Sequence, residues 1–282
     1  MKTAGFIGTG NMGRALAKAV ALKNKALSGT EEEWNLLLSN RTPEKAETLS
    51  REIGGEVTDN RTIASCADYI FLGVKPQMMG GMLSEIAPQL KERCGEDGFQ
   101  KPFILVTMAA GFSMERIQEM AGGDYPVIRI MPNTPAAIGK GVILYSCNEL
   151  VPEEALSEFT KMLSYAGKLY PLPEHLIDAG SSVSGCGPAF VYMFIEALAD
   201  GGVACGLPRK DAYAYAAQMV AGSAELCLKG LKDGVHPGAL KDAVCSPGGT
   251  TIEGVRTLEE AGFRGAVMDA VIAAFEKNKV FH

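Results

Sequence analysis

The stretch Gly8-Thr9-Gly10-Asn11-Met12-Gly13 follows the apolar run Ala4–Ile7 and precedes the helical pattern Arg14–Val20. In such a turn the first glycine permits a tight bend, the second lets the backbone approach a pyrophosphate, and the third allows the helix to pack closely on the strand. The G-x-G-x-x-G pattern alone is weak evidence, but here it stands in the strand–turn–helix context that the motif requires. It predicts a Rossmann fold at the start of the chain.

The second strand of such a fold ends near the adenosine ribose, where an Asp or Glu would accept hydrogen bonds from the 2′-hydroxyl of NAD. In this chain the apolar run Leu36–Leu38 ends in Ser39-Asn40-Arg41-Thr42, which contains no carboxylate. Hydroxyls, an amide and a guanidinium suit a 2′-phosphate, because Arg offers paired charged donors to phosphate oxygens. The sequence therefore favours NADPH, with NADH also possible. Alternatively, Arg41 is a solvated loop charge.

Further strands alternate with helical runs, which predicts parallel β-α-β units with ligands at the carboxyl ends of the strands. Small and proline-rich segments fall at these ends, among them Lys75-Pro76-Gln77, Ala109-Ala110-Gly111 and Pro132–Pro135. The predicted elements are strands at Asp68–Val74, Phe103–Met108, Pro126–Met131, Gly141–Ser146 and Lys168–Pro171, and a helix at Glu153–Tyr165.

After Pro173 the strand patterns stop, and alanine-rich helical patterns continue to the C-terminus. We expect an α/β Rossmann domain over residues 1–173, with a mostly parallel sheet and flanking helices, and an all-helical domain over residues 174–282. The helix predicted at Ala189–Ala204 is apolar on all sides, which a small helical domain cannot cover alone, so we expect subunits to associate through this domain. The other predicted helices are Arg209–Lys229, Gly238–Cys245, Thr251–Glu260 and Phe263–Lys277.

The segment Ser246-Pro247-Gly248-Gly249-Thr250-Thr251 is a proline-and-glycine turn that leads into a helical pattern. Backbone N–H groups at a helix N-terminus can bind an anion, and a Thr side chain can present a neutral hydroxyl beside them. The segment therefore suits a small carboxylate. Alternatively it is an ordinary N-cap, because Ser, Thr and Gly gather at helix starts for structural reasons.

Composition argues against several classes of protein. The 282-residue chain has a net charge of −6, whereas nucleic-acid binding needs a basic face. No apolar run approaches the length of about 18 residues that a membrane span requires, and the glycine-rich turn interrupts any signal-peptide pattern. The seven cysteines are scattered, without C-x-x-C, which indicates reduced thiols rather than disulfides or a zinc site. We expect a cytoplasmic protein without a metal.

Several segments, in the same order and over essentially the whole chain, closely resemble pyrroline-5-carboxylate reductases. They are Gly5–Gly13, Val74-Lys75-Pro76, Asn133-Thr134-Pro135, Ser184–Ala189, Ala197–Val203, Gly206–Arg209, His236-Pro237-Gly238 and Ser246–Thr251. The resemblance implies reduction of the cyclic imine 1-pyrroline-5-carboxylate to L-proline, the last step of proline biosynthesis, with NAD(P)H as hydride donor. It also implies a C-terminal dimerisation domain and larger assemblies of dimers, commonly a decamer.

Carried over by position, the resemblance assigns the cofactor to three groups of residues. The pyrophosphate would be held by Ile7, Gly8, Thr9, Gly10, Asn11 and Met12. The adenosine side would be held by Ser39, Asn40, Arg41, Thr42 and Asn60, and the nicotinamide half by Val74, Lys75, Pro76, Ala109, Ala110 and Gly111.

The resemblance assigns the substrate to Ser246, Gly248, Gly249, Thr250 and Thr251. Backbone N–H groups would bind its carboxylate, and Thr251, the catalytic candidate, would hydrogen-bond the ring nitrogen. The family commonly has Ser where this chain has Cys186, a nearly isosteric change that we expect to alter local hydrogen bonding rather than to abolish activity.

The implied reaction needs a hydride on carbon and a proton on nitrogen, and an imine nitrogen is basic enough to arrive protonated or to take its proton from solvent. Placing C4 of the nicotinamide next to the imine carbon is then the main task of the site. Two alternatives remain. A β-hydroxyacid dehydrogenase shares the glycine pattern and a helical second domain, but it places a catalytic Lys where this chain has Phe190–Met193. A non-catalytic NADP-binding dimer would keep the fold without turnover, and the intact Ser246–Thr251 segment counts against it.

Overall fold

The computed structural model describes residues 1–26, 33–94 and 101–279 of the chain. It divides into two compact units. The first comprises Met1–Cys186 together with the last helix from Ala274 on, and the second comprises Gly187–Ala273.

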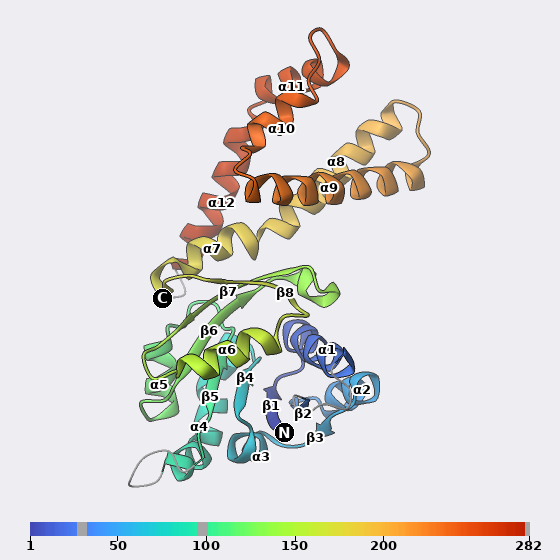
Figure 1. Cartoon of the computed structure of the whole chain (residues 1–282). Helices are drawn as coiled ribbons and strands as arrows, with labels where there is room; N and C mark the ends of the chain where they lie inside the picture. The colour runs from blue at the N-terminus through green and yellow to red at the C-terminus, as the bar shows by residue number, and fades with distance from the viewer. Residues whose placement is uncertain (27–32, 95–100, 280–282) are drawn as a thin grey trace. The chain divides into compact units, whose positions relative to one another are not determined.

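The first unit is built on an eight-stranded sheet with the order β3-β2-β1-β4-β5-β6-β7-β8 (Figure 1). Neighbouring strands are parallel at every described pairing apart from β6 with β7, which is antiparallel. The expectation of a mostly parallel Rossmann sheet is therefore confirmed. The strands are β1 (Lys2–Ile7), β2 (Trp34–Ser39), β3 (Glu56–Val57), β4 (Tyr69–Leu72), β5 (Ile104–Thr107), β6 (Val127–Pro132), β7 (Gly141–Cys147) and β8 (Gly167–Pro171).

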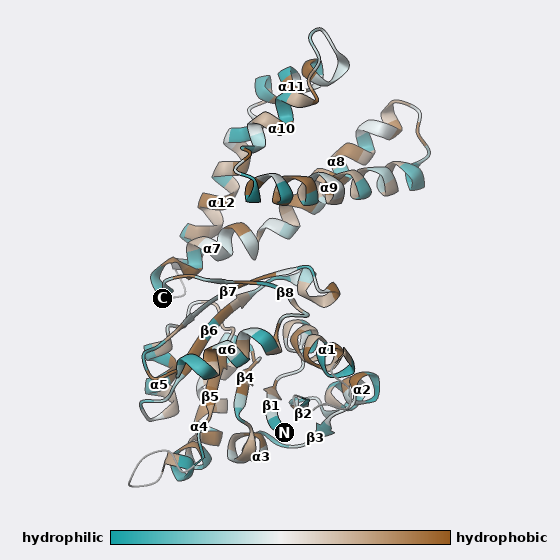
Figure 2. Cartoon of the chain, in the orientation of Figure 1, coloured by the Kyte–Doolittle hydropathy of each residue, from teal (hydrophilic) through white to brown (hydrophobic). Residues whose placement is uncertain are grey.

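Helices cover both faces of this sheet. On one face Phe6, Phe71 and Leu16 belong to a buried cluster with the helices α1 (Asn11–Ala26) and α6 (Glu153–Met162), and the rings of Phe6 and Phe71 stack with their centroids 4.4 Å apart. On the other face Leu83 and Ile117 belong to a second cluster with α3 (Asn60–Cys66), α4 (Pro76–Cys94) and α5 (Met114–Ala121). Strands that are buried on both faces read as continuous apolar runs, and β5 and β6 are accordingly brown in Figure 2.

In the first unit a helix follows each of the strands β1 to β5 along the chain, as a β-α-β fold requires. The helices are α1 (Asn11–Ala26), α2 (Pro43–Ile53), α3 (Asn60–Cys66), α4 (Pro76–Cys94), α5 (Met114–Ala121), α6 (Glu153–Met162) and α7 (Ile177–Ser184), with short 3₁₀ turns η1 (Thr134–Ile138) and η2 (Glu174–Leu176).

The second unit is helical and leaves much apolar surface exposed. Within α8 only Ala199 is buried among the described residues, whereas Tyr192 and Met193 are 59% and 68% exposed. The sequence expectation that this helix has more apolar surface than its own unit covers is confirmed. The helices are α8 (Gly187–Ala204), α9 (Arg209–Lys232), α10 (Pro237–Ala243), α11 (Thr250–Glu260) and α12 (Phe263–Lys279), of which the last part belongs to the first unit.

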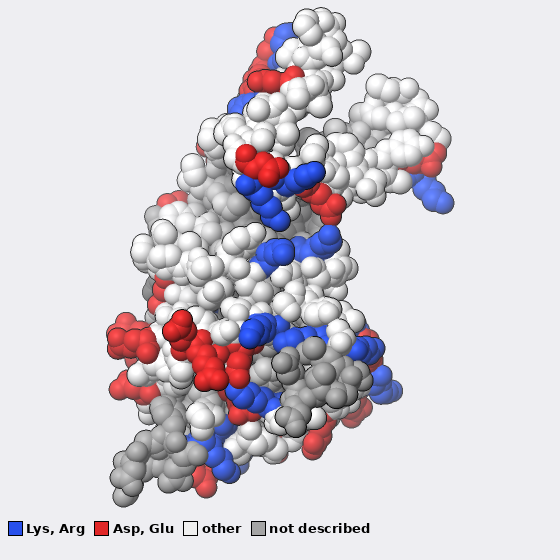
Figure 3. Space-filling view, viewed as in Figure 1, with Lys and Arg blue, Asp and Glu red and all other residues white. Residues whose placement is uncertain are grey.

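One helical run among the described residues, Glu174–Ala204, is long and apolar enough to cross a membrane by length and composition alone. This is weak evidence for a span, because a helix that packs against a partner protein passes the same test. The start of the run carries charge that is used inside the fold: Asp178 pairs with the buried Arg129 at 2.9 Å. On the face of the molecule that Figure 3 shows, lysine and arginine side chains stand beside aspartate and glutamate.

Most predicted elements lie where the sequence places them, with small shifts at their ends. The helix that was expected to stop before Gly230 runs on to Lys232, because Gly230 lies inside α9 where Val235 and Leu240 pack against it. The pattern did not predict α7. This helix packs on β7, so the compact first unit extends to Cys186, beyond Pro173.

Candidate active site

The glycine-rich turn between β1 and α1 has the geometry that its sequence predicts. Gly8 has a φ of 99°, a left-handed conformation that favours glycine. A Cβ at Gly13 would lie 2.1 Å from the Gly8 carbonyl oxygen, so glycine is needed for this close approach. A Cβ at Gly10 would meet nothing within 4 Å. The turn is therefore open at its middle glycine and presents the N-terminus of α1, where N–H groups are free to bind an anion.

The end of β2 is tied to this turn by Asn40. The Thr9 backbone N–H donates to Asn40 Oδ1 at 3.1 Å, and Asn40 Nδ2 donates to the Thr42 carbonyl at 3.0 Å. Both polar atoms of the Asn40 side-chain amide are thus hydrogen-bonded to backbone groups, so Asn40 stabilises the corner rather than projecting freely from it. The turn after β1 and the corner after β2, which the sequence assigned to one cofactor, lie together.

A second polar chain runs from Ser39 through Asn60 to α4. Ser39 Oγ donates to Asn60 Oδ1 at 2.6 Å, and Asn60 Nδ2 donates to Glu85 Oε2 at 2.9 Å. Asn60 is the first residue of α3, whose N-cap Asp59 accepts a hydrogen bond from the Thr62 N–H. That bond holds the pKa of the Asp59 carboxyl below its usual range. The structure therefore brings Asn60 to the corner where the sequence predicted it.

Arg41 stands exposed at the same corner. Among the described residues its guanidinium contacts only the Met78 sulfur, 3.7 Å from Nη1, and a thioether is a weak acceptor. The remaining donors of Arg41 are available to a ligand. This is the arrangement that a 2′-phosphate needs and an internal ion pair would prevent.

The segments after β4 and β5 lie at the same edge of the sheet as the glycine-rich turn. The Gly73 N–H donates to the Ile7 carbonyl at 2.7 Å, and a Cβ at Gly73 would lie 2.5 Å from the Gly8 carbonyl oxygen. The segment Val74-Lys75-Pro76 follows at the start of α4, and Ala109-Ala110-Gly111 follows the neighbouring strand β5. The parallel pairing places all three predicted cofactor segments along one edge.

One buried group at this edge has no partner. Thr9 is 4% exposed, and its Oγ1 makes no hydrogen bond among the described residues. A buried hydroxyl without a partner is costly, and a phosphate oxygen would supply an acceptor. The unpartnered Thr9 hydroxyl and the open position at Gly10 both fit the pyrophosphate of a dinucleotide.

The predicted substrate segment lies in the second unit, at the start of α11. Gly248 has a φ of 68°, which favours glycine, and the Gly249 N–H donates to the Ser246 carbonyl at 3.0 Å. Gly249 is the N-cap residue, and no side chain caps the helix. Thr250 and Thr251 occupy the first turn, as predicted, and both are exposed. The first N–H groups of α11 therefore have no side-chain cap and suit a carboxylate, while Gly249 at the N-cap also fits the alternative of an ordinary N-cap.

Comparison with known proteins decides the family. Residues 174–280 match the family model for pyrroline-5-carboxylate reductase dimerisation, and residues 3–94 match the model for NADP oxidoreductase, coenzyme F420-dependent. The chain is 40% identical over 279 residues to pyrroline-5-carboxylate reductase of Escherichia coli, covering 99% of this chain and 97% of that protein. It is 37% identical to the enzyme of Pisum sativum, covering 98% and 95%. The chain belongs to the pyrroline-5-carboxylate reductase family.

A solved structure of this family supports the same fold. The pyrroline carboxylate reductase of Plasmodium falciparum, determined with NADP bound, superposes with a TM-score of 0.82 at 31% identity and covers 99% of this chain and 98% of that one. Neither the β-hydroxyacid dehydrogenase nor the non-catalytic dimer is favoured by these comparisons. The dimerisation model begins at residue 174, the predicted domain boundary, whereas the compact first unit continues through α7.

Sequence reasoning missed two residues of this chain that the structure brings to the edge of the predicted cofactor segments. Glu85 on α4 fixes the Asn60 amide. Asn133, just after β6, is 7% exposed and bonded on both sides, to the Val142 N–H and the Ser184 carbonyl. Glu85 carries no motif signal. Asn133 lies in Asn133-Thr134-Pro135, one of the segments that resemble the family, but that segment does not indicate the groups to which Asn133 is hydrogen-bonded.

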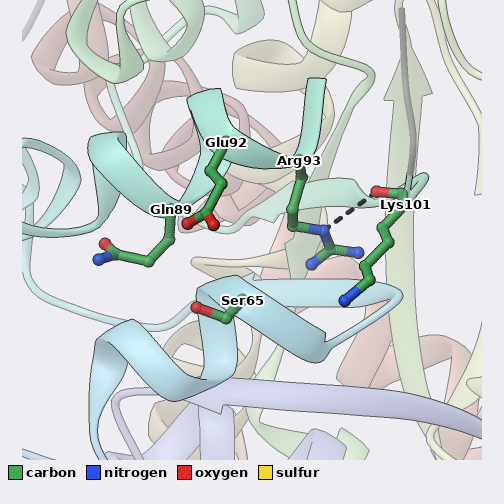
Figure 4. Close-up of a pocket in the computed structure, with 5 residues that line it drawn as sticks. All are labelled: Ser65, Gln89, Glu92, Arg93 and Lys101. Carbon is green, nitrogen blue, oxygen red and sulfur yellow. Dashed lines mark hydrogen bonds between the residues drawn. The ribbon is translucent and has the colours of Figure 1, made fainter. Parts of the chain in front are cut away.

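The described cavities do not coincide with the edge of the predicted cofactor segments. One of about 240 Å³ is lined by Ser65, Gln89, Glu92, Arg93 and Lys101 (Figure 4). Arg93 there has a structural role: its Nη1 donates to the carbonyls of Ala64 and Ala67, and burial lowers its pKa. Another of about 360 Å³ is lined by Met1, Lys2, Lys23, Glu33, Trp34, Glu158 and Lys161. The assignment of the cofactor residues therefore rests on backbone geometry rather than on a cavity.

All seven cysteines are free in the structure. Burial raises the pKa of the Cys147 thiol, which keeps it protonated and inert. Within residues 1–26, 33–94 and 101–279 there is no group of three or more His, Cys, Asp or Glu side chains that could hold a metal ion.

Proposed function

We propose that this chain reduces 1-pyrroline-5-carboxylate to L-proline with NAD(P)H as hydride donor, the last step of proline biosynthesis. The observation that carries the proposal is the 40% identity to a pyrroline-5-carboxylate reductase over 99% of the chain. The open glycine-rich turn and the uncapped start of α11 support it, because each offers N–H groups to an anion.

The first unit has the task of holding the cofactor, which supplies the hydride when bound. The N–H groups at the start of α1 would hold the pyrophosphate, and the unpartnered Thr9 hydroxyl would donate to it. Val74-Lys75-Pro76 and Ala109-Ala110-Gly111 line the nicotinamide half. Lys75 is exposed beside Pro76, at the start of α4, where it serves the cofactor side rather than acting as an acid.

The corner after β2 gives a preference for NADPH over NADH. Arg41 supplies charged donors to a 2′-phosphate, with Ser39, Thr42 and Asn60 around it. No carboxylate stands in the Ser39–Thr42 segment to accept from a ribose 2′-hydroxyl. Glu85 does lie nearby, but its Oε2 already accepts a hydrogen bond from Asn60.

The start of α11 binds the substrate. N–H groups of Gly248 and Thr250 hold the carboxylate, where the helix dipole favours negative charge, while the Gly249 N–H donates to the Ser246 carbonyl and closes the turn. The Thr251 hydroxyl accepts a hydrogen bond from the protonated ring nitrogen and orients the imine. After hydride reaches the carbon, the nitrogen keeps its proton as an amine, so the site needs no strong acid.

The helical unit associates with a second copy, as a dimer or a multiple of dimers up to a decamer. The dimerisation family match over residues 174–280 and the exposed apolar residues of α8 support this assembly. Burial in such an interface also explains the apolar run Glu174–Ala204 without a membrane. Seven free thiols agree with a cytoplasmic location, and the net charge of −6 agrees with a small-molecule partner rather than a nucleic acid.

Substitution of Thr251 tests the substrate site. Thr251→Val keeps the volume and removes the hydroxyl, whereas Thr251→Ser keeps the hydroxyl and removes a methyl group. We expect Val to lower kcat by about 10- to 1000-fold, while Ser retains most activity and the NADPH affinity stays unchanged in both. A wild-type kcat in Thr251→Val would show that this threonine is only part of a helix start.

A further inference from the structure

One face of β6 carries three residues that all contact the same short helix. Side chains in a strand alternate between faces, so Arg129, Met131 and, just past the strand, Asn133 share one side. The helix is α7, which packs on β6 and β7 (Figure 1).

Arg129 holds the first turn of α7. Its side chain is 2% exposed, and Nη2 donates to Asp178 Oδ1 at 2.9 Å. Nη1 lies 3.5 Å from Glu174 Oε1, which also accepts from the Met114 N–H at 2.7 Å. A buried charge is stable only when it is paired, so this arrangement fixes where α7 begins.

Met131 holds the middle of the helix. Met131 forms a buried apolar cluster with Leu144 of β7 and Ile177 of α7. The helix comes so close to the sheet that a Cβ at Gly180 would lie 2.5 Å from Leu144 Cδ1. This tight packing leaves α7 no freedom to slide along the sheet.

Asn133 holds the last residue of α7. Its Nδ2 donates to the Ser184 carbonyl at 2.9 Å, and its Oδ1 accepts from the Val142 N–H at 2.9 Å. Carbonyls at a helix end lack partners within the helix, so the Asn133 amide supplies what Ser184 needs. Because β6 runs parallel to β5, Asn133 lies at the carboxyl edge, the edge of the predicted cofactor segments.

We propose that Asn133 is a positioning residue for the reductase reaction: it fixes Ser184-Gly185-Cys186, the end of the cofactor-binding unit, from which the chain enters the unit that carries the substrate segment. Arg129 and Met131 fix the rest of α7, and the Asn133 amide sets its end. The inference rests on the proposed function, because that reaction needs both the cofactor segments of the first unit and the substrate segment of the second. Small misplacements of reacting groups cost rate rather than cofactor affinity.

The chain provides a matched control for Asn133. Asn148 makes the same kind of bridge at the other end of β6, where Oδ1 accepts from the Val127 N–H at 3.1 Å and Nδ2 donates to the Tyr125 carbonyl at 2.9 Å. The variants Asn133→Asp and Asn148→Asp each replace one N–H donor by a carboxyl oxygen that faces a carbonyl. Only the first change touches α7.

The test measures kcat, NADPH affinity, melting temperature and the pH profile of both variants in the full-length enzyme. We expect Asn133→Asp to lower kcat at neutral pH by about 10- to 100-fold, with NADPH affinity within about threefold of wild type, whereas Asn148→Asp keeps its kcat. Activity of Asn133→Asp relative to wild type should recover as the pH falls, because a protonated carboxyl donates to Ser184 again. Amide hydrogen exchange at residues 185–187 should be faster in Asn133→Asp than in Asn148→Asp.

The outcomes separate this proposal from the proposed function. A wild-type enzyme that does not reduce 1-pyrroline-5-carboxylate contradicts the function and the positioning role with it. An active wild type together with equal kcat in the two variants, or a kcat loss in Asn133→Asp without recovery at low pH, contradicts the positioning role alone. A fall in melting temperature shared by both variants with unchanged kcat would make Asn133 a purely structural bridge.

Discussion

Replacing Asp178 by Asn should destabilise the cofactor-binding unit far more than breaking a surface ion pair. Arg129 is 2% exposed and Asp178 14% exposed, with 2.9 Å between Nη2 and Oδ1. Asn keeps the volume and removes the negative charge, so among the described residues the only carboxylate left to pair with the guanidinium is that of Glu174, which is 28% exposed and 3.5 Å away. Removing one partner of a buried pair costs about 3 to 5 kcal/mol, and the remaining Glu174 places the loss near the lower end.

The single tryptophan of the chain reports on this loss. Trp34 is 7% exposed in the core of the first unit, so its fluorescence during urea denaturation follows the unfolding of that unit. With a urea dependence of about 2 kcal/mol per molar, a loss of about 3 kcal/mol lowers the midpoint by about 1.5 M. The control Glu119→Gln breaks the exposed Arg116–Glu119 pair in the same unit and should cost less than about 1 kcal/mol. Equal midpoints for the two variants would refute the reasoning, because Arg129 would then not depend on Asp178.

Three further predictions address the cofactor site and the core. Arg41→Ala should raise the KM for NADPH by a factor equivalent to about 1 to 3 kcal/mol and leave the KM for NADH nearly unchanged in steady-state assays. Equal increases for both cofactors would contradict a contact between Arg41 and the 2′-phosphate. Gly10→Ala should keep its melting temperature and lose NADPH binding in a fluorescence titration, whereas Gly13→Ala should melt earlier because its Cβ meets the Gly8 carbonyl; normal binding by Gly10→Ala would displace the pyrophosphate from this turn. Burial, together with the negative charge of Glu158, raises the pKa of the Tyr69 hydroxyl. The neutral hydroxyl therefore stabilises the fold fully below the ordinary tyrosine pKa of about 10, and this stabilisation is lost progressively as the pH rises above that value. Tyr69→Phe should therefore lose less stability than wild type on going from pH 9 to about 11, and identical alkaline profiles would speak against the effect.

The cofactor half of the fold could be predicted because its signals are local. Gly8, Gly10 and Gly13 each meet a steric requirement of one turn. In the structure these requirements are a positive φ at Gly8, open space around Gly10 and a close backbone contact at Gly13. The buried strands read as apolar runs for the same reason, since both faces of the parallel sheet are covered. The helix start near Thr250 could likewise be predicted from the consecutive proline, two glycines and two threonines.

Helix α7 escaped prediction because tertiary contacts, not propensity, hold it. Gly180 and the serines at 181, 182 and 184 are weak helix formers. Their helix is fixed by Arg129 and Asn133, which lie 49 and 51 residues from their partners. Glu85 was missed for the same reason, since its bond to Asn60 spans 25 residues. Pairings over such separations cannot be recognised from a single sequence.

The central claim is tested most directly by incubating the full-length protein with NADPH and 1-pyrroline-5-carboxylate and measuring NADPH oxidation together with L-proline formation. The account predicts one L-proline per NADPH consumed, at a rate that Thr251→Val lowers by at least about tenfold. NADPH oxidation without L-proline, or no oxidation while NADPH still binds, would contradict it.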